Sequence, residues 1–317
     1  MSNSTKDIKH RIKSINNTKK ITRAMEMVAA VKMRKAIEAV LRTRSYANLS
    51  WATVLNLSQA MNGQTEEIHP LLVKRKEVKK VAVELITSNR ALCGAYNSAM
   101  INKAHQSVKD NPNQTEFILI GRKGQVVYKY YGYEIAADFP KSDLINELSE
   151  IVPIGQMIIK DYLSGRYDKI MVAYTDFISA SKQIPRIKQL LPVDIASQDE
   201  YLGIIGEDSR LGVDKKFIEG KEKRYLAEGK YIFEYTFEPS PAEVLDEMLP
   251  RLIEIQLYQA MLEANAAEHS ARMNAMHQAT EAAGDMVNEL TLFFNKARQA
   301  SITREIAEIS AGANALK

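Results

Sequence analysis

The stretch of sequence that decides the fold runs from Ser240 to Ala300 and reads SPAEVLDEMLPRLIEIQLYQAMLEANAAEHSARMNAMHQATEAAGDMVNELTLFFNKARQA. It opens with a capping serine, a proline at the first helical position and a glutamate at the third, which together signal a helix start. Small and apolar residues then recur every three or four positions. Twelve steps cover 43 residues, or 3.58 per turn, so we expect a nearly straight helix with weak supercoiling. The predicted seam consists of Leu257, Ala260, Ala264, Ala267, Ala271, Ala275, Ala279, Ala282, Met286, Leu290, Phe293, Ala297 and Ala300.

Three further features of this helix lead to predictions. Pro250 should kink it or split off its first two turns. Nine of the thirteen seam residues are alanine, which lets a partner helix approach closely. The acidic residues are spread along the helix instead of being paired in a pocket, so we expect a solvated or partner-facing surface.

The N-terminal segment predicts a second long helix. Ser4-x-x-Asp7 is a capping-box pattern, and no glycine or proline occurs before Gly63. Some 57 residues at 1.5 Å per residue make a rod of roughly 85 Å, longer than a typical domain is wide. Its apolar stripe consists of Ile8, Ile12, Ile15, Ile21, Met25 and Val28, followed by fewer anchors as far as Met61.

Charge suggests what the two helices pack against. Residues 1–50 hold twelve Lys or Arg and three acids, whereas residues 241–317 hold six bases and eleven acids. A net charge of +9 on the first segment and −5 on the last attracts the two to each other or to partners of opposite sign. We therefore expect residues 10–45 to lie antiparallel to residues 260–300.

Between the helices the pattern changes to short apolar runs that alternate with helical ones, which is typical of an α/β domain with an at least partly parallel sheet. Residues 198–229 are charged and contain several glycines, so they are predicted to be an exposed excursion. The predicted domains are 1–62, 63–238 and 239–317. The predicted strands are Val81–Thr87, Glu116–Gly121, Lys169–Tyr174 and Lys230–Phe237, and the predicted helices are Asn97–Lys109, Lys123–Tyr131 and Glu147–Leu163.

Catalytic and cofactor chemistry finds little support in the sequence. Neither G-x-x-x-x-G-K-[ST] nor G-x-G-x-x-G occurs. The turn Ser88–Gly94 follows a strand and precedes a helix, so it could bind an anion, but its single glycine favours an ordinary strand-to-helix turn. His277 and Glu281 form only half a metal site, and we expect His269 and His277 to be solvated. No cofactor or metal is therefore predicted.

Composition also argues against a disulfide-linked, membrane-spanning, secreted or nucleic-acid-binding protein. Cys93 is the only cysteine, so an internal disulfide is impossible, and a small buried thiol is the expected role. The sequence contains no run of about 18 apolar residues and opens without the apolar core of a signal peptide. Nucleic-acid binding is disfavoured because the basic charge is interleaved with the apolar stripe, and the chain carries its own acidic helix.

Two long motifs carry a family resemblance. Residues 16–30, NNTKKITRAMEMVAA, closely resemble the N-terminal signature of the gamma subunit of F-type ATP synthases. Residues 295–306, NKARQASITREI, resemble its C-terminal signature. The turn at Ser88–Gly94 matches a third family motif, with Asn89 and Ala91 where the family more often has Asp and Gly. The resemblance covers the whole length, strongly over 4–45, 85–97 and 239–316.

The resemblance implies a rotor shaft without an active site of its own. The terminal helices would form an antiparallel coiled coil inside a ring of alternating alpha and beta subunits. A central Rossmann-like α/β domain would lie on the c ring beside the epsilon subunit, at the cytoplasmic face of the bacterial plasma membrane, with one copy per complex. ATP chemistry would belong to the beta subunits. Plastid relatives carry two redox-active cysteines near 198–229, and this chain has none there.

Residue by residue, the resemblance implies three groups of contacts. Ile21, Met25 and Val28 match the shaft surface near the moving lever of beta, although Met25 would serve equally well in a coiled-coil core. Arg298 and Gln299 match positions that engage the ring. Two aromatic residues match the foot that faces the c ring, namely Tyr235 and Phe237.

Two alternatives remain open at this point. Periodicity alone would also allow a non-enzymatic coiled-coil scaffold of another assembly. An α/β enzyme with helical arms is disfavoured because no catalytic constellation is present.

Overall fold

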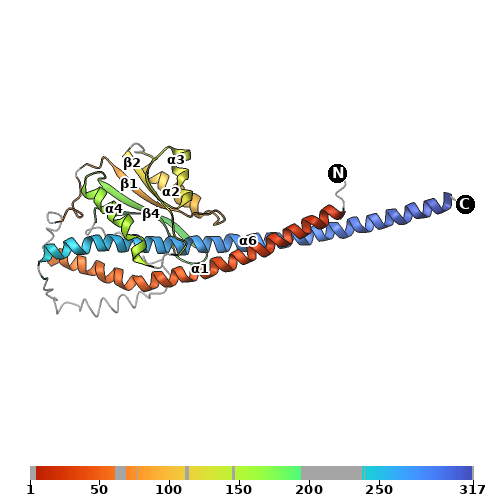
Figure 1. The fold of residues 1–317 in the computed structure, drawn as a ribbon, viewed down its shortest axis with the longest axis horizontal. Helices are drawn as coiled ribbons and strands as arrows, with labels where there is room; N and C mark the ends of the chain where they lie inside the picture. Colours follow the sequence, from red (N-terminus) through yellow and green to blue (C-terminus); the bar gives the residue numbers. More distant parts are fainter. Residues whose placement is uncertain are drawn as a thin grey trace. The chain divides into compact units, whose positions relative to one another are not determined.

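The computed structural model describes residues 5–60, 69–75, 77–110, 114–144, 147–193, 238 and 240–315 (Figure 1). Two helices account for the ends of the chain, α1 from Thr5 to Ala60 and α6 from Pro241 to Ala315. The chain divides into two compact units. Unit 1 combines Met1–Ala29 with Arg272–Lys317, and unit 2 is the segment Ala30–Ala271.

The start of α6 follows the predicted capping pattern. Ser240 Oγ accepts a hydrogen bond from the Glu243 N–H at 3.3 Å and donates one to the Glu243 carboxylate at 3.0 Å. Pro250 lies within α6, and the helix is continuous through it. Of the two predicted outcomes, a split of the first two turns is therefore wrong, and a kink at Pro250 stays a prediction. The proline removes one hydrogen-bond donor, a local loss that the packing of the neighbouring turns outweighs.

Unit 2 contains a five-stranded sheet in the order β3-β2-β1-β4-β5. Strands β1 to β4 are parallel, and β5 pairs with β4 in the antiparallel direction. The expected partly parallel α/β sheet is thus confirmed. The strands are β1 Val81–Ile86, β2 Thr115–Ile120, β3 Glu134–Phe139, β4 Lys169–Phe177 and β5 Gln183–Leu191.

Sequence patterns found the three central strands and missed the two edges. Strands β1, β2 and β4 are buried and read as continuous apolar runs. Strand β3 is only half buried and contains two acids, and β5 alternates charged with apolar residues around Pro185. An edge strand tolerates such residues because one of its sides makes no ladder hydrogen bonds. The predicted strand Lys230–Phe237 and the predicted excursion 198–229 lie outside the described residues.

Helices cover both faces of the sheet (Figure 1). On one face, side chains of β1 and β2 pack with α2, Tyr96–Val108, and α3, Val126–Tyr131. On the other face the core includes α4, Val152–Leu163, and the part of α6 that belongs to unit 2. Short turns η3, Arg122–Gln125, and η4, Leu148–Glu150, precede α3 and α4. The three predicted helices of the domain are confirmed in position.

The middle of α6, from Leu252 to Ser270 in unit 2, is buried on every side. All residues from Leu252 to Ser270 are buried, and they include Glu254, Glu263 and Glu268. The prediction that the acids of this helix form a solvated surface is therefore wrong for these three. The prediction assumed that α6 packs against a partner on one face only and leaves its polar face in solvent. Here several elements of unit 2 enclose the helix, so its polar face is buried as well.

Glu84 lies at the centre of the apolar core. Strand β1 places it between Ile118 of β2 and Val172 of β4. Its side chain is fully buried, and neither carboxylate oxygen has a hydrogen-bond partner among the described residues. Burial raises the pKa of Glu84 from 4.5 to about 8, because the charged form loses its hydration. The side chain is therefore neutral at pH 7.

Glu84 makes stability depend on pH. Between pH 4.5 and about 8 the carboxyl group is ionised in the unfolded chain and protonated in the folded one, so stability falls as the pH rises through this window. The loss amounts to about 4–5 kcal/mol at about 1.4 kcal/mol per pH unit, and it levels off above pH 8. We expect Glu84→Met to remove this decline. The free energy of unfolding in urea, measured at pH 5, 6, 7 and 8, checks this prediction. An equal decline with pH in the wild type and in Glu84→Met would contradict it.

Candidate partner-binding surface

The five ring-contact residues proposed from the sequence all belong to unit 1. On α1, Ile21 and Val28 are exposed, at 60% and 56%, and Met25 is half buried. On α6, Arg298 and Gln299 are exposed. The two foot residues, Tyr235 and Phe237, lie outside the described residues.

The buried line of α1 in unit 1 explains why Ile21 and Val28 are exposed. Ile8, Thr22 and Ala29 are buried, and they are separated by 14 and 7 residues. This is the spacing of a heptad repeat, in which every seventh residue returns to the same face. Ile21 and Val28 each precede a member of that line, so they point away from it. The predicted apolar stripe is therefore wrong at Ile21 and Val28. Its other members fit, because Ile8 is buried and Ile12, Ile15 and Met25 are half buried.

The unit 1 seam of α6 also has a different phase from the predicted one. Its buried residues are Met276, Thr280 and Ala283, and half-buried residues continue the line at steps of four and three: Val287, Leu290, Phe294 and Ala297. The line advances 21 residues in six steps, or 3.5 per turn, instead of the predicted 3.58. Four residues of the predicted seam are exposed, so the prediction is wrong for Ala282, Met286, Phe293 and Ala300.

Contacts within unit 1 join the two helices in opposite directions. Oγ1 of Thr22 and Oγ1 of Thr280 lie 2.8 Å apart, and His277 Nδ1 lies 3.2 Å from the Glu26 carboxylate. A Cβ atom added to Gly284 would lie 3.0 Å from Nζ of Lys19. As the residue number on α1 increases, the residue number of its partner on α6 decreases, so the two helices run antiparallel in unit 1. His277 is half exposed, as predicted for a solvated histidine.

Large apolar side chains lie on the outside of unit 1. They number nine among its described residues and are exposed by about half or more: Ile21, Met27, Val28, Met286, Leu292, Phe293, Ile302, Ile306 and Ile309. Large apolar side chains left exposed in such number are typical of a protein that contacts other subunits. Arg298 and Gln299 lie among these residues in the sequence of α6 and add polar groups to the same helix.

In unit 2 the turn Ser88–Gly94 uses its own polar groups. The Ser88 N–H donates to Asn97 Oδ1 at 2.9 Å, and the Ser88 hydroxyl donates to the Arg90 carbonyl at 2.7 Å. Asn97 Nδ2 donates to Ser88 Oγ and lies 3.2 Å from the sulfur of Cys93. These bonds are those of an ordinary strand-to-helix turn. Cys93 is buried and free, as predicted.

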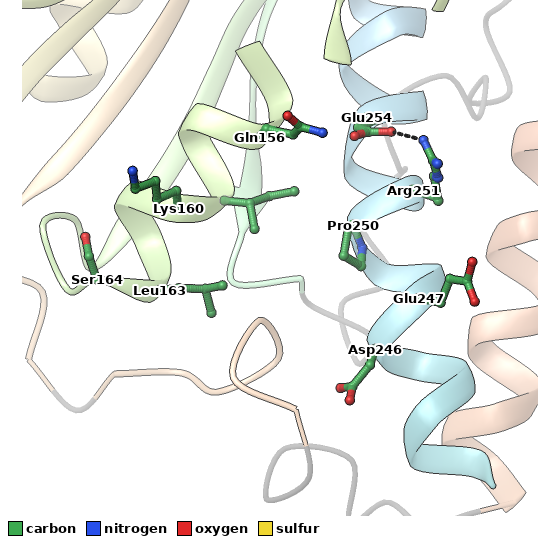
Figure 2. Close-up of a pocket in the computed structure, with 10 residues that line it drawn as sticks. Gln156, Lys160, Leu163, Ser164, Asp246, Glu247, Pro250, Arg251 and Glu254 are labelled. Carbon is green, nitrogen blue, oxygen red and sulfur yellow. Dashed lines mark hydrogen bonds and ion pairs between the residues drawn. The ribbon is translucent and has the colours of Figure 1, made fainter. Parts of the chain in front are cut away.

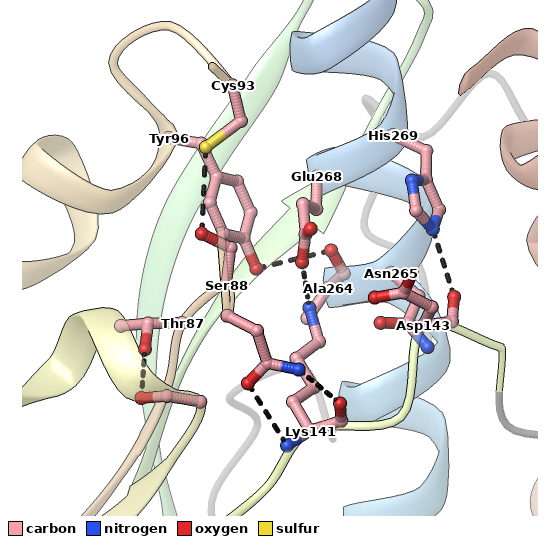
Figure 3. Close-up of polar contacts among 12 residues, drawn as sticks. Thr87, Ser88, Cys93, Tyr96, Lys141, Asp143, Ala264, Asn265, Glu268 and His269 are labelled. Carbon is pink, nitrogen blue, oxygen red and sulfur yellow. Dashed lines mark hydrogen bonds and ion pairs between the residues drawn. The ribbon is translucent and has the colours of Figure 1, made fainter. Parts of the chain in front are cut away.

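The carboxyl ends of the parallel strands are covered by α6. In open α/β sheets this edge is the usual site for ligands. Here the Tyr96 hydroxyl donates to the Ala264 carbonyl at 3.2 Å, and Lys141 forms an ion pair with Glu268 (Figure 3). His269 Nε2 lies 2.9 Å from the Asp143 carbonyl, and its residue is 2% exposed. The prediction that His269 is solvated is therefore wrong, because the loop after β3 encloses it.

A cleft of about 720 Å³ lies between α4 and the first turns of α6 (Figure 2). Its walls carry Gln156 and Lys160 from α4, and Asp246 and Glu247 from α6. Arg251, also on its wall, is held by Glu254 at 3.0 Å. Lys160, Asp246 and Glu247 are exposed charges of both signs, and the wall residues do not pair a nucleophile with a general base.

The part of the chain that the structure describes contains neither a candidate metal site nor a candidate membrane span. No three His, Cys, Asp or Glu side chains in the described ranges converge as metal ligands would. Likewise, none of the described helices combines the length and apolarity needed to cross a bilayer.

Comparison with known proteins places these features in context. The model of the ATP synthase family matches residues 4–316. The ATP synthase gamma chain of Pelotomaculum thermopropionicum is 38% identical over 314 residues, which are 99% of each chain. That of Legionella pneumophila is 35% identical, over 98% of this chain and 99% of the relative. A chain of the Euglena gracilis mitochondrial ATP synthase has the same fold, with a TM-score of 0.63 at 16% identity over 98% of this chain and 94% of that one.

The structure and these matches define a non-catalytic subunit of a larger assembly, with an α/β domain and helices that expose apolar side chains. The chain belongs to the ATP synthase family as one of its gamma chains. A chain of the rotor of the Euglena gracilis mitochondrial ATP synthase has the same fold as well, with a TM-score of 0.58 at 17% identity over 94% of this chain and 98% of that one. The two other readings of the sequence, a scaffold of a different assembly and an α/β enzyme, are thereby removed.

Two adjacent alanines test the phase of the unit 1 seam. Ala283 is buried and Ala282 is exposed, so the same substitution enters opposite faces of α6. We expect Ala283→Glu to destabilise unit 1 by about 2–4 kcal/mol, because it buries a charge without a partner. Ala282→Glu should change stability by less than about 0.5 kcal/mol. Helix content followed by circular dichroism during heating measures both, and equal melting curves would refute the observed phase.

Proposed function

We propose that α1 and α6 form an antiparallel coiled coil that turns inside a ring of alternating alpha and beta subunits. One observation carries the proposal: unit 1 pairs the two helices in opposite directions, through contacts such as Thr22–Thr280 and Glu26–His277, while large apolar side chains are exposed. A shaft needs this arrangement, since it must hold itself together with few atoms and present contact surface to the surrounding subunits.

In the proposed division the coiled-coil helices are residues 1–62 and 239–317, and the α/β domain is residues 63–238. The α/β domain contacts the epsilon subunit and the c ring, with Tyr235 and Phe237 at the foot. The excursion 198–229 lies on the surface of this domain. One copy works in each complex, at the cytoplasmic face of the bacterial plasma membrane, held there by its partners. These assignments rest on the family resemblance.

Rotation couples to ATP synthesis through differential contacts. The two helices of unit 1 present different side chains around the shaft, with Ile21 and Val28 on α1 and Phe293, Arg298 and Gln299 on α6. Three beta sites around such a shaft meet three different faces and therefore have different affinities for nucleotide. Turning the shaft exchanges the faces and hence the affinities, as coupling requires. The chemistry of ATP takes place in the beta subunits.

Cysteine cross-linking tests the antiparallel register. In an antiparallel pair, the residue numbers of facing positions have a constant sum. The sum is 302 for Thr22 and Thr280 and 303 for Glu26 and His277, so Ile15 should face Val287. We expect Ile15→Cys/Val287→Cys to form a disulfide readily on oxidation, because only facing positions bring Cβ atoms within about 4.5 Å. Ile15→Cys/Met273→Cys, which would face each other only in a parallel pair, is the matched control. A faster bond in the control would disprove the proposal. Native Cys93 is buried and should not compete.

A second experiment tests the exposed face. We expect Ile21→Asp/Val28→Asp to leave the stability of the free chain within about 1 kcal/mol, because both side chains are already exposed. In the assembled complex the same variant should lower ATP synthesis several-fold, because two apolar contacts with the ring are lost. Asn17→Asp, at an exposed polar position of the same helix, is the control. Normal synthesis by the double variant would show that the ring does not use this face.

A further inference from the structure

The loop that follows β3 binds α6 through three consecutive residues. Lys141 Nζ lies 2.5 Å from the Glu268 carboxylate. The Ser142 carbonyl accepts a hydrogen bond from Asn265 Nδ2 at 3.4 Å, and the Asp143 carbonyl lies 2.9 Å from His269 Nε2. Figure 3 shows the Lys141–Glu268 contact and the His269–Asp143 contact. We refer to residues 141–143 and their partners on α6 as the latch.

The central pair of the latch is removed from water. The side chains of Lys141 and Glu268 are 2% and 5% exposed. The ammonium group also lies over the ring of Tyr96, 5.6 Å from its centroid, and the Tyr96 hydroxyl donates to the Ala264 carbonyl one turn before Glu268. A buried ion pair with such neighbours holds a narrow geometry, because displacing either charge leaves the other unpaired in a medium that cannot solvate it.

The loop itself is held from the sheet side. Asn89, in the turn after β1, donates from Nδ2 to the Lys141 carbonyl and accepts from the Lys141 N–H at 3.4 Å. The same Asn89 oxygen accepts from the Arg122 N–H at 3.4 Å. One side chain therefore ties Lys141 to the carboxyl ends of β1 and β2. The latch is thus anchored at the carboxyl ends of two parallel strands of the sheet.

The latch also reaches α1. Lys32 Nζ lies 2.6 Å from the Asp143 carboxylate. The hydrogen bond and charge of Lys32 hold the pKa of Asp143 below its usual value. Asp143 is about half exposed, so this contact contributes less than the central pair. Residues 141–143 nevertheless connect both long helices to one point of the sheet.

We propose that Lys141 and Glu268 are positioning residues that fix the rotational angle of α6 relative to the α/β domain and so transmit torque between them. The remaining contacts of α6 in unit 2 are mostly apolar, and apolar contacts are non-directional, so they resist separation more than rotation. The buried ion pair and the hydrogen bonds at 264, 265 and 269 have preferred directions and fix the angle. This proposal rests on the proposed function as a rotor and adds the point at which the domain engages the shaft.

The experiment uses complexes reconstituted with the full chain. In Lys141→Met/Glu268→Leu the central pair becomes apolar with similar volume, a replacement that usually keeps or raises stability while it removes direction. The control is Glu77→Leu/Lys79→Met, which removes an ion pair of the same kind whose side chains are 77% exposed. Three quantities are measured: the melting temperature of the free chain, the ATP hydrolysis rate of the complex, and the protons pumped per ATP.

We expect the latch variant to melt near the wild-type temperature and to hydrolyse ATP, but to pump roughly fivefold fewer protons per ATP, as for loss of a modest coupling free energy. The control should match the wild type in all three. If the variant with the apolar pair does not fold, Tyr96→Phe/Asn265→Leu replaces it. This second variant removes the Tyr96–Ala264 and Asn265–Ser142 hydrogen bonds without leaving a charge unpaired. It should lower the number of protons pumped per ATP while ATP hydrolysis stays normal. A wild-type pumping ratio in whichever latch variant assembles overturns the proposal. If the wild-type chain does not assemble into the complex, or if the wild-type complex does not pump protons, the proposed rotor function is overturned instead.

Discussion

A helix that is enclosed on all sides must satisfy every polar group it carries from within the protein, and this constraint governs unit 2. Between Leu252 and Ser270 no residue of α6 is exposed, yet the segment contains acids, amides, a histidine and a serine. Buried polar groups without partners cost free energy, and neighbouring loops supply partners for several of them. Gln259 Oε1 and Asn265 Oδ1 have no hydrogen-bond partner among the described residues. The Ser270 hydroxyl donates to the Ala180 carbonyl at 2.7 Å and accepts from Gln183, and the loop after β3 serves the opposite side. The carboxyl edge of the sheet, which binds a ligand in many α/β proteins, contacts α6 here.

Several parts of the fold were predictable because they depend on local patterns. Buried parallel strands are continuous apolar runs, and the first turn of α6 carries its own capping signal, so β1, β2, β4 and the helix start followed from residues that are neighbours in sequence. Strands β3 and β5 were missed because an edge strand is half solvated and loses the apolar signal. Their existence depends on pairing with distant segments, which a local pattern does not encode.

The errors along α6 share one physical cause. Alanine is common on several faces of this helix, so a line of alanines does not identify the buried face. The observed line instead passes through Met276 and Thr280, and the exposed large residues lie beside it. The partner-facing residues were named from the family resemblance, and the exposure of Ile21 and Val28 is consistent with that role. The latch had no local signal, because Lys141 and Glu268 are separated by 127 residues.

The wide separation of the unit 1 partners has a consequence for synthesis of the protein. Thr22 and Glu26 contact residues that follow them by 258 and 251 positions. At about 5–20 residues per second, the first helix leaves the ribosome roughly 10–50 s before its partner exists. During that interval Ile8 and Ala29, buried in the finished protein, have no cover from α6. The nascent chain therefore presents a basic helix with an uncovered apolar line, so factors that bind such segments during translation have a defined period in which to act.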